Sequence, residues 1–385
     1  MITVDVAVIG PGIIGACAAW HLAQAGCRVA VLGDQRAGTA TSAAVGMLTP
    51  TCEWETYEPR EWLSFLREAA NYYPDFLRRI GLEDTDFRAA AGFRELDFYV
   101  LDFHERAPAL AGYAELARSL DSDCDYLAPQ DPALRRIGID TALIRGAMHV
   151  RGEAVVDPRR LAPLVYDALG RTGRVDVIPT AVVGVDSTST ETIRLRCADD
   201  VVLDCDRVLI AAGAWSAEVA DLFGLDVPVF PVRGQIIELA GPPGLLQDVL
   251  YLPVGACGCL LERAAGQYIC GTSEEYRAGT AENTVEVVST ILDRVRRTFP
   301  MAGRWSVSDM WAGFRPQTAD RLPLIGASRD PRISIATGHF RNGILAGPLT
   351  GRVIADHITG TSHFDLALYC PTRALSDPIS VAARF

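Results

Sequence analysis

The chain has 385 residues, enough for two domains with a large apolar core, because single domains usually run to about 100–200 residues. Hydrophobic residues make up 49% of it and charged residues 22%, which is typical of a globular protein and excludes a disordered one. The formal net charge of -12, with no basic run, argues against nucleic acid as a partner.

A glycine turn near the start of the chain predicts a nucleotide site. The apolar runs 2–9 and 28–32 have the character of buried parallel strands, and the residues between them repeat at helical spacing. In such a βαβ unit Gly10 would allow a tight turn, Gly12 would let a pyrophosphate approach the backbone, and Gly15 would let the helix pack on the sheet. The helix N-terminus would then face the phosphates. The alternative is a glycine-rich turn that binds nothing.

Small residues follow the second strand, from Gly38 to Pro50. Small side chains suit a backbone that lies against a flat ligand, and the hydroxyls of Thr41 and Ser42 could donate to phosphate oxygens. A flexible loop is the alternative, although the run carries no charge after Arg36. The next segment, residues 61–80, is predicted to be an amphipathic helix whose aromatic stripe serves packing.

The chain is then expected to leave the nucleotide region and to return to it. Residues 87–150 are mixed, with one strand at 98–101 and one helix within 106–120. A buried strand over 206–210, followed by a glycine turn at Gly213, returns the chain to the nucleotide sheet. Between these parts we predict a helix and four short strands, over residues 159–169, 175–178, 181–185, 193–197 and 201–203.

A second region has antiparallel character from about residue 228. Short β-rich pieces alternate there with Gly and Pro up to residue 270, and a helix is predicted over 283–298. No repeat or low-complexity linker separates the two regions. We therefore expect the second domain to be inserted in pieces into the first.

The last quarter of the chain places an arginine in an apolar setting. Arg315 stands among Trp, Phe and Pro in WAGFRP, where an unpaired guanidinium would be costly. It therefore either meets an internal carboxylate or waits for one on a substrate, which its fork geometry would bind through two hydrogen bonds. Further on, Gly338 and Gly343 precede a helix predicted over 344–358, whose N-terminus would present N–H groups and a positive dipole to an acceptor.

Seven motifs occur in the order found in the FAD-dependent D-amino-acid oxidase family, and they resemble most its glycine oxidase and thiazole-biosynthesis oxidase group: GPGIIG, SAAVGML, GEAVVDP, AAGAWS, PVRGQ, WAGFRP and GHFRNGI. The resemblance extends over nearly the whole chain. It implies an α/β fold in which a Rossmann-like FAD-binding domain (residues 1–85, 150–225 and 312–385) is interleaved with an antiparallel-sheet α+β substrate domain (residues 86–149 and 226–311). It also implies oxidation of an amine next to a carboxylate.

The resemblance implies FAD as the cofactor and places its contacts along the chain. Ile13 and Ile14 would lie over the pyrophosphate, and Val182 would hold the adenine end. The residues from His339 to Leu345 would touch the isoalloxazine, and the helix after them would stabilise negative charge on it. The full predicted set of cofactor contacts is Gly10, Gly12, Ile13, Ile14, Gly15, Gly33, Asp34, Thr41, Ser42, Val45, Gly46, Met47, Val182, Gly213, Trp215, His339, Phe340, Arg341, Asn342, Gly343, Ile344 and Leu345.

Non-covalent attachment of this FAD is expected. In the related sarcosine oxidases a cysteine attaches the flavin, and here it should lie near Arg315. No cysteine occurs between Cys270 and Cys370.

The same resemblance makes Arg315 the clamp for the substrate carboxylate and the main contributor to catalysis. A neutral amine hands hydride from its α-carbon to flavin N5 when binding aligns the two. No general base is required, so none of the six histidines needs a catalytic role, and His339 is expected to position backbone. Arg341 and Met47 are further candidates near the substrate. For Arg341, a surface or ion-paired arginine is an equal alternative.

Two positions depart from the family pattern. The family usually ends the second strand with Glu, whose carboxylate binds the ribose hydroxyls, but here Gly33 stands there, followed by Asp34. Either Asp34 takes over through a shifted loop, or the ribose contact is missing and FAD is held less tightly. Near the substrate, Cys259 stands where relatives have Tyr, so that hydroxyl is absent or comes from Tyr251. Glycine is therefore a doubtful substrate, and a larger or N-substituted amino acid is a live alternative.

Several functional classes stay open on these grounds. The first is an oxidase that uses dioxygen on a small amino acid and releases hydrogen peroxide. The second is an amino-acid dehydrogenase or biosynthetic tailoring enzyme that passes electrons from a larger amine-carboxylate to another acceptor. A nucleic-acid-modifying or non-catalytic role is disfavoured by the acidic charge. An NADP reductase based on Arg36 would leave WAGFRP and GHFRNGI unexplained.

The remaining expectations concern compartment and partners. Ten cysteines without paired spacing predict reduced thiols and a cytoplasmic protein, and Cys257 and Cys259 lack the further ligands of a metal site. The first residues already form a strand, so no cleavable signal is expected, and no stretch reaches the ~18 apolar residues of a membrane helix. The expected partners are an amino-acid substrate and dioxygen, and a homo-oligomer is compatible with the sequence.

Overall fold

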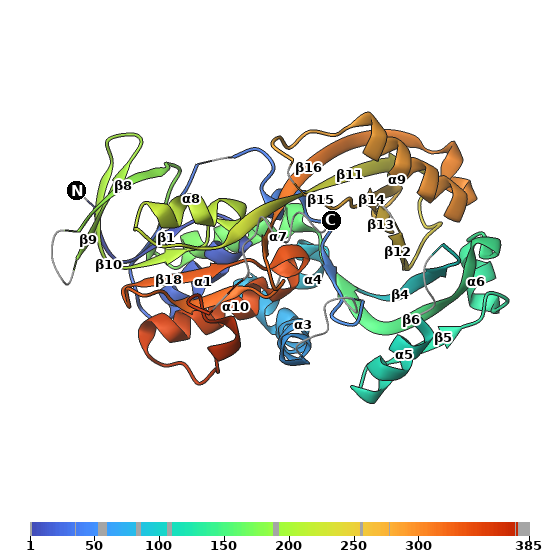
Figure 1. The fold of residues 1–385 in the computed structure, drawn as a ribbon, viewed down its shortest axis with the longest axis horizontal. Coiled ribbons are helices and arrows are strands. Elements are labelled where there is room, and N and C mark those ends of the chain that lie inside the picture. Colours follow the sequence, from blue (N-terminus) through green and yellow to red (C-terminus); the bar gives the residue numbers. More distant parts are fainter. Residues whose placement is uncertain are drawn as a thin grey trace.

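A largely parallel sheet built on β1 (Ile2–Ile9) organises one half of the molecule (Figure 1). Its eight strands include the path β17-β18-β10-β1-β2-β7, and β8 and β9 extend it as an antiparallel hairpin from β10. β1 pairs in parallel with β10 on one side and β2 on the other, and the apolar half of β1 is buried. The other strands are β2 (Val29–Leu32), β7 (Val175–Ile178), β8 (Val182–Ser187), β9 (Ile193–Cys197), β10 (Val202–Ile210), β17 (Leu324–Ala327) and β18 (Ile333–Thr337).

The structure is a computed structural model. It describes residues 2–34, 36–52, 60–81, 86–105, 110–187, 192–254, 257–276, 278–373 and 375.

Helix α1 (Ile13–Gln24) packs against this sheet and against α10 (Gly343–Thr359), while α3 (Arg60–Ile80) covers α10 in turn. All of α1 except its last residue is buried, as expected of a helix with apolar residues all round. Gly351 lets the two helices approach closely, because a Cβ there would stand 2.6 Å from the carbonyl carbon of Cys17. The glycine turn is thus held between a buried strand and a buried helix.

A second, ten-stranded sheet forms the other half and has the path β15-β11-β14-β13-β12-β4-β6-β3, with β16 paired to β11 and β5 to β6. The strands are antiparallel except where β12 meets β4, which is a parallel pair. The long strands β11 and β16 run side by side (Figure 1). The bounds are β3 (Met47–Leu48), β4 (Arg94–Phe103), β5 (Cys124–Leu127), β6 (Ile144–Val155), β11 (Val229–Ala240), β12 (Val249–Val254), β13 (Cys257–Ala264), β14 (Gln267–Gly271), β15 (Glu275–Tyr276) and β16 (Ser306–Thr318).

Helix α9 packs on this second sheet through Ile291 and Val295, which join Phe299, the residue after the helix, in one apolar cluster with the strands. Helix α7 is capped at its N-terminus by Asp157, whose carboxylate accepts from the backbone N–H of Arg159. The remaining helical segments are α2 (Ala40–Ala43), α4 (Phe87–Ala91), α5 (Leu110–Ser119), α6 (Pro132–Ile137), η2 (Thr141–Leu143), α7 (Pro158–Arg171), η3 (Gly213–Trp215), α8 (Ser216–Asp221), α9 (Val285–Thr298), η4 (Pro300–Arg304), η5 (Phe340–Asn342) and η6 (Ala367–Tyr369).

The predicted mixed α/β fold, with a Rossmann-like sheet beside an antiparallel one, is confirmed. One local prediction was wrong: the pieces 201–203 and 206–210 are a single strand, β10. The pieces are joined through Asp204, which is paired across the hairpin with Arg194 through two bonds of 2.8 Å. Of the helix predicted within 106–120, residues 106–109 lie outside the described residues.

The division into two domains at the stated boundaries stays a prediction. Strands β6 and β16 cross the proposed boundaries at residues 150 and 312, and β3, from the first segment, joins the second sheet. Residues assigned to the FAD-binding segments therefore contribute to strands of the second sheet. Among the described helices, none has both the length and the apolar character that crossing a bilayer requires.

Candidate active site

A cavity of about 590 Å³ is lined by both sheets, from the glycine turn after β1 to strands β11, β13 and β16. Every predicted site residue lines it except Gly15 and Leu345. Gly15 lies under the turn, where a Cβ would stand 2.0 Å from the carbonyl oxygen of Gly10, and Leu345 is buried in the helical core. The structure thus brings together residues that are more than 300 positions apart in the sequence.

The glycine turn requires its glycines for close backbone approach. A Cβ on Gly10 would stand 2.3 Å from the carbonyl oxygen of Ala211, at the end of β10. Gly12 is the N-cap of α1 and offers no side-chain cap. The Ile13 N–H instead donates to Thr41 Oγ1 at 3.0 Å. Thr41 therefore caps the helix that was predicted to face the phosphates, and its own hydroxyl proton is left to donate.

The small-residue segment lies against β16. The backbone N–H of Phe314 donates to the carbonyl oxygen of Gly38 at 2.8 Å, and a Cβ on Gly313 would stand 2.4 Å from that of Ala43. The Ser42 hydroxyl lies within hydrogen-bond distance of both the hydroxyl and the carbonyl oxygen of Thr39. The segment is small in part because it packs on another strand, and it lines the cavity at the same time.

The end of the cavity at Gly33 and Asp34 contains compensated charges. Arg36 donates to Asp34 at 3.2 Å and to Glu218 at 3.0 Å, and its guanidinium lies 5.5 Å from the centre of the Trp215 ring. Because two carboxylates already neutralise Arg36, this site offers little net positive charge for binding the 2'-phosphate of NADP, which an NADP reductase based on Arg36 would require.

The other end of the cavity is built by η5 and the first turn of α10. His339 is buried, and burial lowers its pKa to about 3, so its ring is neutral at physiological pH. Its Nε2 lies 3.0 Å from Thr350 Oγ1, whereas its buried Nδ1 has no hydrogen-bond partner in the part of the chain that the structure describes. Since buried ring nitrogens normally have partners, a group bound here is expected to supply one. The lining therefore fits the predicted flavin dinucleotide.

Arg315 of β16 is held by neutral groups. Its Nη1 donates to the Ser273 carbonyl oxygen at 2.9 Å, and its Nη2 donates to the Thr272 hydroxyl. Burial lowers the pKa of Arg315, and the nearby Glu274 carboxylate partly offsets this. None of the ion pairs among the described residues includes Arg315. A cation held in this way can accept a ligand carboxylate.

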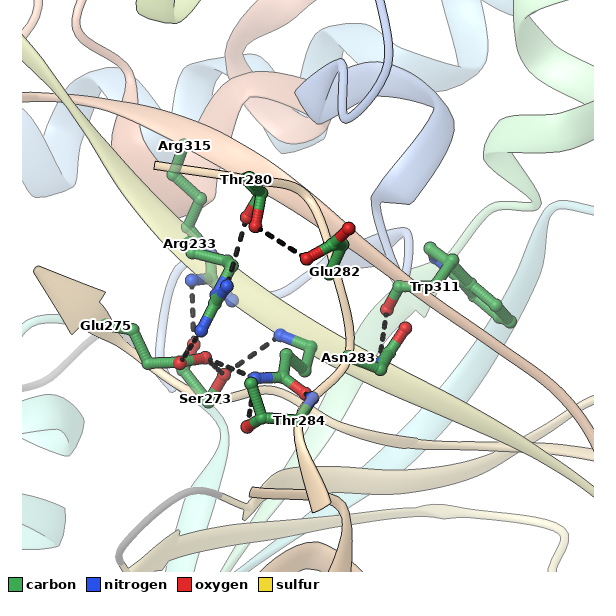
Figure 2. A network of polar contacts seen from close by, with 10 residues as sticks. Arg233, Ser273, Glu275, Thr280, Glu282, Asn283, Thr284, Trp311 and Arg315 are labelled. Carbon is green, nitrogen blue, oxygen red and sulfur yellow. Dashed lines mark hydrogen bonds and ion pairs between the residues drawn. The ribbon is translucent and has the colours of Figure 1, made fainter. Parts of the chain in front are cut away.

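The neighbouring strand makes room for this guanidinium. Gly234 of β11 lies beside it, and a Cβ there would stand 2.4 Å from Arg315 Nη2. The segment that carries Ser273 is anchored by Glu275, which bonds Arg233 at 2.5 Å and Gln235 at 2.9 Å (Figure 2). Burial raises the pKa of Glu275, but the hydrogen bonds to its carboxylate have the larger combined effect and hold the pKa below its usual value. The network therefore fixes the two acceptors of Arg315.

The predicted hydroxyl donor Tyr251 lies at the same end of the cavity. Its hydroxyl accepts from Arg341 Nη1 at 3.1 Å, and Cys259 is its cross-strand partner on β13. Arg341 also pairs with Glu274, at 3.3 Å. Arg341 thus lines the cavity and is also ion-paired, so the two predicted alternatives for this residue, a place near the substrate and an ion pair, are not exclusive. Met47 lines the cavity as predicted.

Sequence reasoning missed Thr272 and Glu274, which line the cavity and contact the two arginines. They follow β14 in the stretch Cys-Gly-Thr-Ser-Glu-Glu from Cys270 to Glu275. The available signal was the pair of consecutive acids after a β-rich stretch. Because successive residues of an extended chain face opposite sides, the two carboxylates were bound to have different surroundings.

Comparisons with known proteins agree with this geometry. The model of the family described as FAD dependent oxidoreductase (DAO) matches residues 5–357. The chain is 28% identical to a glycine oxidase of Geobacillus kaustophilus (strain HTA426) over 379 residues, which cover 96% of this chain and 97% of that protein. It is 30% identical to a bifunctional ThiO/ThiG protein of Synechocystis sp. over 375 residues, 92% of this chain but 52% of that protein. The crystal structure of glycine oxidase from Geobacillus kaustophilus superposes with a TM-score of 0.88 at 28% identity, covering 98% of this chain and 100% of that one.

Proposed function

Because the chain belongs to the DAO family of FAD-dependent oxidoreductases, with FAD as its cofactor, we propose that it is an amino-acid oxidase. The substrate is a small amino acid, namely glycine, an N-substituted glycine or a D-amino acid. Its amine is oxidised to an imine that water hydrolyses to an oxo acid, and dioxygen is reduced to hydrogen peroxide. Arg315 carries this proposal, as a cavity guanidinium with neutral partners at the end opposite the ribose.

The protein's own contribution is binding and alignment. Arg315 binds the substrate carboxylate through two hydrogen bonds, and Tyr251 places a hydroxyl beside it. Bound FAD supplies the hydride acceptor. Alignment of the α-carbon with that acceptor would lower the barrier, because the entropy of orientation is lost on binding. Since a neutral amine gives up hydride, no side chain has to take a proton from the α-carbon. The neutral ring of His339, bonded to Thr350, positions the turn at η5.

The cofactor is proposed to be held non-covalently, by the predicted contacts that line the cavity. The N–H groups at the start of α1 would hold the phosphates, and those at the start of α10 would stabilise negative charge on the flavin ring. The nine cysteines whose side chains are described are free thiols, which supports a reducing compartment such as the cytoplasm.

The test is an amine screen on the FAD-loaded protein. Glycine, sarcosine, D-alanine and D-proline are each mixed with the protein under air, and hydrogen peroxide and oxygen uptake are measured. Peroxide in proportion to amine consumed supports the oxidase. Flavin bleaching without peroxide points to a dehydrogenase with another acceptor, and no bleaching by any amine-carboxylate contradicts the proposal.

A further inference from the structure

Among the described residues, the substrate end of the cavity is lined by the guanidiniums of Arg315 and Arg341 and by the carboxylate of Glu274. Arg315 has neutral partners, whereas Arg341 pairs with Glu274 at 3.3 Å. Both cations lie near the Phe340 ring, at 5.9 Å (Arg315) and 5.6 Å (Arg341) from its centre. The side chains of Arg341 and Glu274 are 20% and 34% exposed, so the pair is wetter than a core ion pair.

Glu274 and Glu275 are consecutive in the chain but bond different partners. Glu275 belongs to the network of Figure 2, where it bonds Arg233, Gln235 and Ser273. Glu274 lines the cavity and accepts a hydrogen bond from Arg341. Glu275 therefore anchors this segment of the chain, whereas Glu274 lines the cavity and bonds Arg341.

The charges at the substrate end of the cavity limit the number of carboxylates that a bound ligand can carry. One ligand carboxylate compensates Arg315. A second carboxylate reaching Arg341 would meet a guanidinium that Glu274 already neutralises, and would lie beside the Glu274 anion itself. A repulsive element of this kind discriminates between ligands even when both share the first contact.

We propose that Glu274 determines the charge specificity of this site. It occupies Arg341 and thereby restricts the enzyme to amines with a single carboxylate. Without its charge, Arg341 becomes a second carboxylate site, and amines with two carboxylates are accepted. This inference rests on the proposed function, whose substrate class it narrows.

The variant that tests it is Glu274→Gln, which removes the charge but keeps the size and an oxygen that can accept from Arg341. The two substrates are sarcosine and iminodiacetate, which differ by one carboxylate. We expect the ratio of kcat/KM for iminodiacetate to that for sarcosine to rise at least 10-fold in the variant. The double variant Glu274→Gln/Arg341→Met should lose this gain. Glu282→Gln is the matched control, since Glu282 does not line the cavity and bonds Thr280 at 3.0 Å.

A second measurement does not depend on turnover. Methoxyacetate and diglycolate are ether analogues of the two substrates, and their binding is read from the flavin absorbance of each variant. We expect diglycolate to bind wild-type protein at least 10-fold more weakly than methoxyacetate, and this gap to close in Glu274→Gln. Bound-flavin content shows that each variant is folded.

The outcomes separate the two proposals. Oxidation of sarcosine with an unchanged ratio in Glu274→Gln overturns the role of Glu274 and leaves the oxidase intact. A closed gap in ligand binding, with no amine oxidised, supports the role of Glu274 and contradicts the oxidase. Equal binding of both ligands to wild-type protein, or binding of neither to any variant, overturns the role of Glu274.

Discussion

Pro11 occupies the space that a side chain at Gly33 would need. A Cβ on residue 33 would stand 2.3 Å from Pro11 Cδ and 2.9 Å from Cγ. Pro11 is itself held, because the Tyr166 hydroxyl donates to its carbonyl oxygen at 2.6 Å. The glutamate that the family resemblance implies at the end of the second strand therefore has no room here. Pro11 and Gly33 are thus sterically coupled, and Asp34 is the acid left for the predicted ribose contact.

Restoring that glutamate should harm the protein. We expect Gly33→Glu to lower the free energy of unfolding by about 1–3 kcal/mol, because real Cβ atoms do not approach within 3.0 Å of other atoms. FAD affinity, measured by fluorescence quenching, should fall with it. The double variant Pro11→Ala/Gly33→Glu should recover both quantities in part. A Gly33→Glu variant as stable as wild type would contradict the steric explanation.

Removing the proposed carboxylate clamp should impair substrate binding without loss of cofactor. Loss of a charged, bidentate contact costs about 2–5 kcal/mol, so Arg315→Ala should lose roughly 30-fold or more in kcat/KM on amine-carboxylates. The bound-flavin spectrum should be retained, because Arg315 lies at the substrate end. Steady-state kinetics with the best amine of the screen provide the measurement, and unchanged kinetics would refute the assignment of Arg315.

The glycine beside this arginine should matter for the same reason. In Gly234→Ala the new methyl group would stand 2.4 Å from Arg315 Nη2, so the guanidinium would have to move. Misplacement of a binding group can cost on the order of 10- to 100-fold in rate. Since the effect acts through Arg315, Gly234→Ala should add little in an Arg315→Ala background. Additive losses in the double variant would show that Gly234 acts by another route.

Acid should destabilise the protein in part through His21 of α1. Burial, followed by the charges of Arg79 and Arg352, lowers the pKa of His21 to about 3. The folded protein therefore leaves this ring neutral, while the unfolded chain takes up a proton below about pH 6.5. Stability is lost as pH falls from about 6.5 toward 3, and at pH 5 the His21 contribution is ~2 kcal/mol.

The measurement is urea unfolding of wild-type protein and His21→Gln at pH 7 and pH 5. The variant should show the smaller decrease in free energy of unfolding between the two values, whatever its absolute stability. An equal decrease in both proteins would mean that His21 does not bind a proton on unfolding in this range.

Much of the architecture followed from local patterns. The spacing of Gly10, Gly12 and Gly15 between an apolar strand and a helix is encoded within fifteen residues, and so is the start of α10 after Gly338. The unusual setting of Arg315 was visible in the same way, because an arginine among aromatic residues must have a polar partner. Local sequence thus predicted the two ends of the cavity.

Only the tertiary structure decided which residues share the cavity. Glu274 meets Arg341 from 67 positions away, and Tyr251 meets it from 90, because β12, β14 and η5 converge there. Strand order and register determine such contacts, and these depend on the summed packing of the whole sheet. The periodicity of the sequence therefore determined which faces are buried and where a nucleotide turn begins. The pairing of strands decided that Pro11 excludes a side chain at residue 33 and that Glu274 neutralises Arg341, since each contact joins atoms that chain connectivity alone does not bring together.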